Sequence, residues 1–387
     1  MKASTFVVIA SLILQPLMHA ARSQSAVAPG NRGRTVQRWI VDTAPTLEVR
    51  MKDTLNFSLI VGLSLLPDGG IVIASDIANN LQYFNRNGTY VRSVGRMGRG
   101  PGEFQGIGSF HRFGDSLAVV DLQGVFQFFA VTGKYIRTAP PLINKSRTLG
   151  FFADGRLIAG SLDYTGLETG KWRQATELLQ VWRGSDARTL GRFPSVLAYR
   201  GKEGSVKGNV YSPRNRVAVL ANHFCAGFAG STSIKCYDAG GRDRASIRLR
   251  GRADVAVTKA DEEAYFQDIY DANVGEPKAK LDAQERAARA RVTFATSMGY
   301  FGDLIASRDN SLWVGPPSNK DGRPFAQNAL PDKPTQWDIY DLSGNALAVV
   351  ELPARFRLME AGENYVAGVT ADHDGLEVVR VLRLTKK

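Results

Sequence analysis

Short apolar runs recur along this chain, and each is preceded by a turn that contains Gly, Asn or Asp. These residue types supply the positive φ angles that tight hairpin turns need. Runs of about five residues bounded by such turns are typical of strands. The runs read IVIAS, LAVVD, LIAGS, VAVLA, LWVGP and YVAGV, at residues 71–75, 117–121, 157–161, 217–221, 312–316 and 365–369. The pattern predicts a repeated β-hairpin, with each run as the second strand of its unit.

A further apolar run follows each of these strands, and in several units another turn leads to an outer strand. These runs lie at residues 81–85, 126–130, 178–183, 234–238, 337–341 and 378–384, and all except the last contain an aromatic residue. We therefore divide the chain into six units of four strands, named A to D from the inside outwards. Repeats of this kind are typical of propeller blades. The predicted fold is all-β, a six-bladed β-propeller with a helical insertion between blades four and five.

The two ends of the repeat are predicted to meet. The last unit has only three strands, while residues 35–50, ahead of the first A strand, have β character. An open ring would leave exposed strand edges. We therefore expect residues 35–50 to form strand D of the sixth blade, and residues 35–387 to form one propeller domain.

One segment, residues 254–298, interrupts the strand pattern and is rich in Ala, Glu, Lys and Arg, which favour helix. Thr258 and Asp261 fit a capping box at a helix start, and Tyr265 and Ile269 share one helical face. Some 40 residues bury little core by themselves. The segment is predicted to be a helical insertion that packs on one face of the propeller.

The N-terminus has the features of a secretory signal peptide. Lys2 is followed by an apolar run at residues 6–14 and then by small residues. We predict a signal peptide at residues 1–23 and a secreted or periplasmic product; a retained anchor helix is the alternative. The apolar run is too short to span a membrane, and no second long apolar stretch follows, so no transmembrane segment is expected after cleavage.

The formal net charge is +12, which could suit nucleic acid or an anionic surface. No nucleic-acid module is recognisable, and export argues against a genome partner, so no nucleic-acid partner is expected. An anionic polymer of the cell envelope stays open as a partner. More generally, the expected partner is a protein, a glycan or a small molecule.

The chain has two cysteines, Cys225 and Cys236, on either side of a predicted hairpin tip. A cysteine pair in an oxidising compartment usually forms a disulfide. Cross-strand Cβ atoms lie about 4.5–5.5 Å apart, near the roughly 3.5–4.5 Å that a disulfide needs. A disulfide is predicted, with two buried free thiols as the alternative.

The best-defined repeat resembles a known family. Residues 73–88, IASDIANNLQYFNRNG, are similar to the NHL-repeat signature, in which a strand ends in Asp, Asn follows, and an aromatic strand leads to a Gly turn. The link at residues 95–104, GRMGRGPGEF, resembles that family's connector between blades. The close match covers the first blade and its exit, and later blades keep the pattern loosely. The resemblance implies a six-bladed NHL-like propeller of a divergent secreted type.

Candidate metal ligands come from the loops between strands B and C, which share one face of a propeller. These loops are predicted to carry Asp76, Asp121, Asp163, His223, Asp321, Asp372 and His373. Carboxylates suit Ca²⁺ and imidazoles suit Zn²⁺. We take Asp76, Asp121, His223 and His373 as candidate ligands of Ca²⁺ or Zn²⁺. The alternative is that the strand-end Asp residues cap their own loops by accepting backbone N–H bonds and that His223 and His373 are solvated loop histidines.

Known catalytic motifs are not found: the chain has no H-E-x-x-H, no G-x-S-x-G and no complete P-loop. The expected function is therefore a ligand- or protein-binding or scaffold module rather than an enzyme. The alternative is a metal-dependent hydrolase, lactonase or lyase that uses the central channel, as similar propeller enzymes do.

Overall fold

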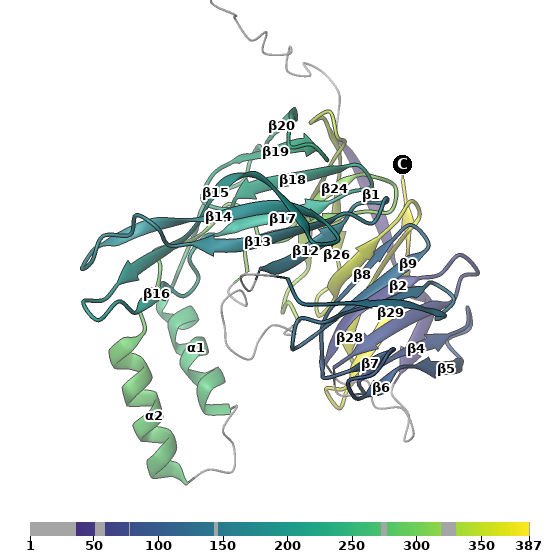
Figure 1. Ribbon diagram of the computed structural model, residues 1–387, viewed down its shortest axis with the longest axis horizontal. Coiled ribbons are helices and arrows are strands. Elements are labelled where there is room, and N and C mark those ends of the chain that lie inside the picture. Colours follow the sequence, from purple (N-terminus) through teal and green to yellow (C-terminus); the bar gives the residue numbers. More distant parts are fainter. Residues whose placement is uncertain are drawn as a thin grey trace, which may run out of the picture. The chain divides into compact units, whose positions relative to one another are not determined.

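The computed structural model describes residues 36–50, 59–76, 78–142, 146–271, 277–318 and 330–386. The chain divides into two compact units, Met1–Thr35 and Val36–Lys387, and all described residues belong to the second. The predicted signal peptide at residues 1–23 lies outside the described residues, and so does Asp321. The described part is almost entirely strand, with two helices (Figure 1).

Among the described residues, the main strands form six units of four antiparallel strands, in sequence order. Blade one contains β2 (Ile60–Leu65), β3 (Ile71–Ser75), β4 (Asn80–Phe84) and β5 (Tyr90–Val94); blade two contains β8 (Ile107–Phe113), β9 (Ser116–Asp121), β10 (Phe126–Ala130) and β11 (Tyr135–Ala139). Blade three contains β12 (Arg147–Phe151), β13 (Leu157–Asp163), β14 (Trp172–Arg183), β15 (Asp186–Arg200) and an extra strand β16 (Val206–Gly208). Blade four contains β17 (Asn215–Val219), β18 (His223–Phe228), β19 (Ser233–Asp238) and β20 (Asp243–Arg248). Blade five contains β23 (Leu304–Ala306), β24 (Leu312–Val314), β25 (Thr335–Tyr340) and β26 (Ala346–Leu352); blade six contains β27 (Arg357–Ala361), β28 (Tyr365–Ala371), β29 (Glu377–Thr385) and β1 (Gln37–Arg50).

The six blades close into a ring. The A strand of each blade contacts the A strand of the next, and β27 of blade six contacts β2 of blade one. Blade six takes its outer strand from the start of the described chain, because β1 pairs antiparallel with β29 from Ile40↔Thr385 to Arg50↔Val378. The first residues of β1 also pair in parallel with β26 of blade five. The A strands therefore surround a central channel.

Packing between blades uses the aromatic C strands. Tyr83 on β4 and Phe129 on β10 are both buried in one cluster between blades one and two. Backbones approach closely at the A strands: a Cβ on Gly62 would lie 2.5 Å from the Cβ of Phe110, so this position has room only for glycine. Phe104, from the predicted connector, is fully buried in the same cluster, so the connector anchors the link between these two blades.

Blade four corrects the sequence-based strand assignment. Residues 217–221 were expected to form its B strand, but they continue the A strand β17, and β18 is the B strand. The turn between β17 and β18 contains no glycine and is closed by a bond from Leu220 N to His223 O, 2.8 Å. The prediction is wrong here because this turn contains no glycine, whereas the turn-like residues at 213–216 lie at the start of strand A.

Blade three carries an arm formed by β14 and β15. These strands have 12 and 15 residues, more than their neighbours, and β16 pairs with the end of β15. Figure 1 shows both strands as long ribbons. Because strand C begins and strand D ends on the side of the B–C loops, the arm rises on that side of the propeller.

Two helices, α1 (Lys259–Asp271) and α2 (Lys278–Arg291), follow strand β20. They lie between β21 (Val255–Ala256) and β22 (Ser297–Gly299), which pair with each other. The amide of Thr258 donates to Asp261 Oδ2 at 2.9 Å and the amide of Asp261 donates to Thr258 Oγ1 at 3.3 Å, which is the reciprocal geometry of a capping box. Tyr265 of α1 is buried beside Tyr211, whose hydroxyl donates to Asp261 O at 2.8 Å. No helix in the described ranges is long and apolar enough to cross a membrane.

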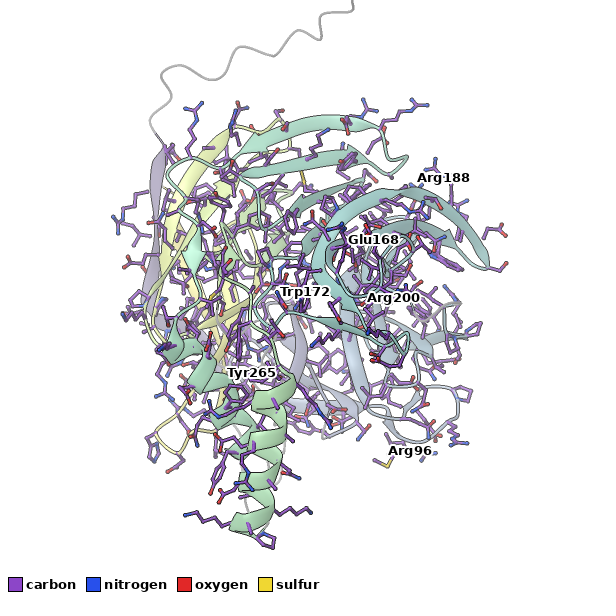
Figure 2. The ribbon with its side chains drawn as sticks, turned by 90° about the vertical axis from the view of Figure 1, so that its left-hand side faces the viewer. Arg96, Glu168, Trp172, Arg188, Arg200 and Tyr265 are labelled. Carbon is purple, nitrogen blue, oxygen red and sulfur yellow. A yellow bond between two sulfur atoms is a disulfide. The ribbon has the colours of Figure 1, made fainter. Side chains whose placement is uncertain are left out.

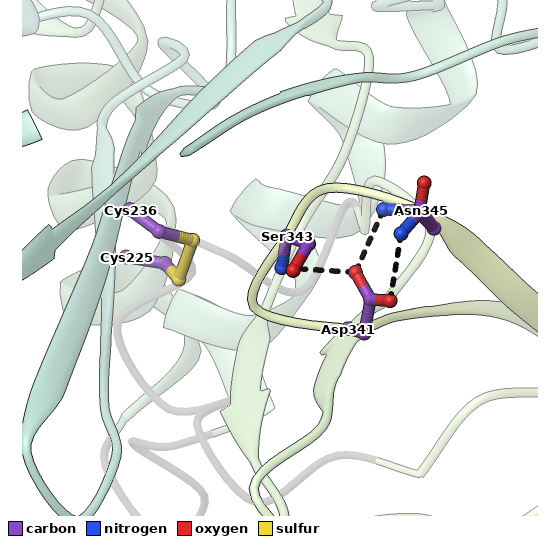
Figure 3. The surroundings of a disulfide bond; sticks show 5 residues. All are labelled: Cys225, Cys236, Asp341, Ser343 and Asn345. Atoms are coloured by element: carbon purple, nitrogen blue, oxygen red, sulfur yellow. Dashed lines mark hydrogen bonds between the residues drawn. A yellow bond between two sulfur atoms is a disulfide. The ribbon is translucent and has the colours of Figure 1, made fainter. Parts of the chain in front are cut away.

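The predicted disulfide is confirmed. Cys225 on β18 lies directly opposite Cys236 on β19, and the two sulfurs are bonded (Figure 3). Both residues are fully buried. Figure 3 also shows the turn after β25, where Asp341 Oδ1 accepts from the amides of Ser343 and Asn345 at 2.9 and 2.8 Å.

Candidate functional site

The carboxylates at the ends of two B strands are used by the backbone. Asp121 is buried, and its Oδ1 accepts from the amides of Gln123 and Val125 at 2.9 and 2.8 Å. Asp76 Oδ1 accepts from the amide of Ile107 at 2.8 Å, so it holds the first residue of the next blade. Both residues stabilise loops through backbone N–H groups.

The same use of carboxylates is seen in two other B–C loops. Asp163 Oδ1 accepts from the amide of Thr165 at 2.9 Å, and Arg192 Nε donates to Asp163 Oδ2 at 2.9 Å. The bonds from Thr165, followed by that from Arg192, lower the pKa of Asp163 to about 2. Asp372 Oδ1 accepts from the amides of residues 374 and 376 at 3.0 and 2.9 Å.

His223 does not lie in a B–C loop, which corrects its predicted position. It is the first residue of β18 and pairs with Asp238, the last residue of β19. In an antiparallel blade, the start of strand B is on the side of the A–B turn, opposite to the end of strand B where Asp76 and Asp121 lie. The error follows from the strand assignment of blade four.

His373 is in the predicted loop, but it is exposed. Its side chain is 86% exposed, and Nε2 lies 3.0 Å from Asp374 Oδ2. Within the described ranges, the only compact group of three metal-type side chains is Asp372, His373 and Asp374 of this one loop. Asp76, Asp121, His223 and His373 are therefore not gathered around a common point, and binding of Ca²⁺ or Zn²⁺ stays a prediction.

A cavity of about 500 Å³ opens in the central channel, lined by residues from the A strands of all six blades. Its charged wall lies where these strands turn into the B strands, and we call this end of the channel the turn-side mouth. Arg112 comes from β8, Arg308 follows β23, and Glu360 comes from β27. The ring thus brings together three charged groups from distant parts of the sequence.

Glu360 is the centre of a hydrogen-bond network at the turn-side mouth. Its Oε2 accepts from Ser64 Oγ at 2.7 Å and from Arg308 Nη2 and Nε at 2.9 and 3.1 Å. Its Oε1 accepts from the Leu65 amide at 3.0 Å and from the Tyr365 hydroxyl at 2.7 Å. A carboxylate offers about four lone-pair sites, so Glu360 has no acceptor capacity left.

The two arginines meet at Ser64. Arg112 Nη1 and Arg308 Nη2 donate to the same Ser64 Oγ, at 3.3 and 2.9 Å, and Arg112 also donates to Leu65 O. Burial, followed by the nearby Arg308 guanidinium, lowers the pKa of Arg112. Burial, followed by the Glu360 carboxylate, raises the pKa of Tyr365, so its hydroxyl stays a donor. The carboxylates of Glu360 and Asp115 both act on Arg112 and oppose the lowering of its pKa.

Sequence reasoning missed this cluster because its members belong to three different turns. Arg308 and Glu360 lie in segments that the sequence marks only as turns ahead of predicted B strands, and Arg112 is the next-to-last residue of β8. The sequence does contain one indication of the cluster: a charged residue stands near the end of three A strands, and in a closed ring the ends of the A strands surround the channel. No observation in the described residues favours the metal-dependent hydrolase, lactonase or lyase.

Comparison with known proteins supports the fold. The model of a family described as "6-bladed beta-propeller" (DUF5128) matches residues 54–142, which include blades one and two. No curated protein matches the chain in sequence. The family match covers under half of the chain, and it does not identify the NHL type.

Solved structures agree at the level of the fold. A DUF4221 family member from Bacteroides vulgatus has 9% identity over 91% of this chain and 100% of its own, with a TM-score of 0.55. A protein of Bacteroides fragilis described as exported has 12% identity over 91% and 100%, with a TM-score of 0.45. The calcium-binding protein regucalcin of Agrobacterium tumefaciens has 10% identity over 91% and 98%, with a TM-score of 0.38. The last two are too distant in structure to carry an argument. The chain is therefore an all-β propeller protein, and its first two blades match a six-bladed propeller family.

Proposed function

We propose that this protein is an exported binding module that holds a small organic anion in the turn-side mouth of its channel. One observation carries the proposal: Arg112 and Arg308 share Ser64 Oγ, and the carboxylate that bonds to this cluster, Glu360, is saturated by five donor atoms. An anionic ligand would add a further acceptor for the two guanidinium groups.

The physical basis is the cost of placing like charges in a partly desolvated cavity. Charge-assisted hydrogen bonds from arginine to a carboxylate are among the strong ones in proteins, and arginine presents a fork that matches a carboxylate in two-point contact. The cavity of about 500 Å³ falls in the usual range of small-ligand sites. Apolar residues such as Phe110 and Leu149 line the same cavity, so a ligand with a short carbon chain fits better than a bare ion.

The test is calorimetry with succinate, citrate and inorganic phosphate as probes. We expect a carboxylate to bind, and Arg308→Gln to weaken that binding by about 10-fold or more, because a hydrogen bond to a charged group contributes about 1.5–3 kcal/mol. Arg86→Gln, an exposed arginine on blade one, is the matched control and should bind like the wild type.

Three results would overturn the proposal: no carboxylate binding up to about 10 mM, equal affinity in Arg308→Gln, or equal loss in the control. Thermal melting of each variant separates lost binding from lost folding. Arg112→Gln provides a second, independent measurement of the same site.

Export and the helical insertion are part of the proposal. The Cys225–Cys236 disulfide fits an oxidising compartment, which supports the predicted signal peptide and a secreted or periplasmic location. The position of α1 and α2 after β20 and before β23 supports an insertion between blades four and five. Mass spectrometry of the secreted product should find a mature N-terminus near residue 23; an intact Met1 would contradict export by cleavage.

A further inference from the structure

The opposite end of the channel has a separate polar pocket, at the start of the A strands. It has a volume of about 500 Å³ and lies between blades three and four, beside the arm. We call it the arginine pocket. Its charged and polar lining includes Arg147, Tyr164, Glu177, Arg214, Asn215 and Arg216. Because Arg147 and Asn215 begin β12 and β17, this pocket and the turn-side mouth are at different ends of the A strands.

A buried carboxylate lies in the wall of the arginine pocket. Glu177 on β14 is 3% exposed. Its Oε1 accepts from Arg147 Nη2 at 3.2 Å and its Oε2 accepts from Asn215 Nδ2 at 2.9 Å. Gly160 makes the room, since a Cβ there would lie 2.3 Å from Glu177 Oε1. With about four lone-pair sites on a carboxylate, Glu177 keeps capacity to accept hydrogen bonds from a ligand.

The pocket also presents donors and a positive charge. The Arg147 side chain is 64% exposed and contacts Glu177 through one nitrogen, so the rest of its guanidinium faces solvent. Arg216 lies 3.7 Å from Asp303, and Arg214 is the third arginine. Burial raises the pKa of Tyr164, so its hydroxyl remains a donor.

We propose that the arginine pocket binds a sugar acid, that is, a hexuronate unit of an acidic glycan. The carboxylate of the sugar would pair with Arg147, and its ring hydroxyls would donate to Glu177 and accept from Tyr164. A bare anion would use only the arginines and leave Glu177 as a repelling charge. The combination of a buried acceptor with exposed arginine therefore selects an acid that also carries hydroxyl groups.

The arm carries an aromatic pair beside the arginine pocket, with Lys207 Nζ 5.9 and 5.3 Å from the ring centroids of Trp172 and Tyr199. Trp172 and Tyr199, on β14 and β15, have ring centroids 5.5 Å apart and are both partly exposed. Arg200, next to Tyr199, donates to Tyr164 O at 2.9 Å, so the aromatic pair is tied to the wall of the arginine pocket. Figure 2 labels Trp172 and Arg200 on this arm. Aromatic faces with an apolar body and a polar tip suit partly wet binding surfaces.

The test measures binding of a galacturonate trimer by calorimetry, with a galactose trimer as the neutral comparison. We expect the acidic trimer to bind about 10-fold or more tightly than the neutral one, and Arg147→Gln to weaken it by a similar factor. Arg188→Gln changes an exposed arginine near the start of β15, at the other end of this strand from Tyr199 (Figure 2); it is the matched control and should leave binding unchanged.

The experiment separates this site from the turn-side mouth. Loss of trimer binding in Arg147→Gln but not in Arg308→Gln supports the arginine pocket, whatever happens to succinate or citrate. Loss only in Arg308→Gln would overturn the assignment, as would equal affinity for the neutral trimer. Displacement of the trimer by an equal concentration of inorganic phosphate would show that the pocket recognises only negative charge, and this result would contradict the assignment to a sugar acid.

Discussion

At the residue scale, acidic side chains of this propeller serve two different purposes. Asp121 and Asp76 accept backbone N–H bonds at the ends of B strands, while Glu360 and Glu177 hold arginines at the two ends of the channel. The distinction comes from position: a carboxylate at the start of a tight loop finds the amides of that loop, whereas Glu360 and Glu177 lie within strands and accept mostly from side chains outside their own strand.

Asp121→Ala should lower the free energy of unfolding by about 1–2 kcal/mol, because two amides of the loop lose their acceptor. Asp121→Asn keeps an acceptor oxygen and should lose less than half as much. Chemical denaturation measures both. If Ca²⁺ or Zn²⁺ stabilised the wild type but not Asp121→Asn, the metal-ligand role would stand and the capping role would be secondary.

His111 should make stability depend on pH. Burial lowers the pKa of this histidine from 6.5 to about 4. Between these values the unfolded chain binds a proton that the folded chain does not, so stability falls as pH drops from about 6.5 towards 4. The full effect is at most about 3 kcal/mol. Denaturation curves at pH 7 and pH 4 should differ less for His111→Gln than for the wild type; an equal difference would contradict a buried neutral imidazole.

At the element scale, strand pairing explains both a success and an error of the sequence analysis. The cysteines were placed on paired strands, and β18 and β19 bring Cys225 opposite Cys236. In the same blade, the residues of strand A were predicted to form strand B, because the turn from β17 to β18 has no glycine. The error then moved His223 to the other side of the propeller.

Reduction of the Cys225–Cys236 disulfide should cost about 3 kcal/mol of stability, since the bond closes a short loop in the unfolded chain. Guanidinium titrations with and without reductant measure the difference. The Cys225→Ala/Cys236→Ala variant is the control and should not respond to reductant. A wild-type midpoint that is unchanged by reductant, in a sample whose thiols titrate as free, would contradict the expected stabilisation.

At the scale of the whole molecule, the ring depends on one strand from the other end of the chain. β1 pairs with β29 and, at its start, with β26. It also buries Trp39, Leu47 and Val49. Blades gain most of their stability from their neighbours. By completing blade six, β1 therefore also stabilises the contact between blade six and blade one.

Deletion of residues 35–50 should therefore destabilise the protein by on the order of 5 kcal/mol, the value for losing three buried side chains at about 1.5–3 kcal/mol each. Deletion of residues 1–34 alone is the control and should leave the melting temperature unchanged. Thermal melting compares the two. A truncated chain that melts within a degree or two of the control would show that β1 does not close the ring.

The sequence by itself determined the features that depend on neighbouring residues. Alternating apolar runs and turn residues predicted the B strands of five blades, the all-β class and the paired cysteines, because hairpins join residues that are close in the chain. The capping box of Thr258 and Asp261 is local in the same way. These features need no knowledge of how the blades are arranged.

Only the tertiary structure decided which side chains face each other in the channel. Arg112, Arg308 and Glu360 come from three blades, and Arg147, Glu177 and Asn215 come from two. Nothing in their spacing marks them, because ring closure and not sequence distance sets these contacts. The candidate metal ligands lie apart for the same reason: Asp76 and Asp121 accept from nearby backbone amides, and His223 lies at a strand end on the opposite side.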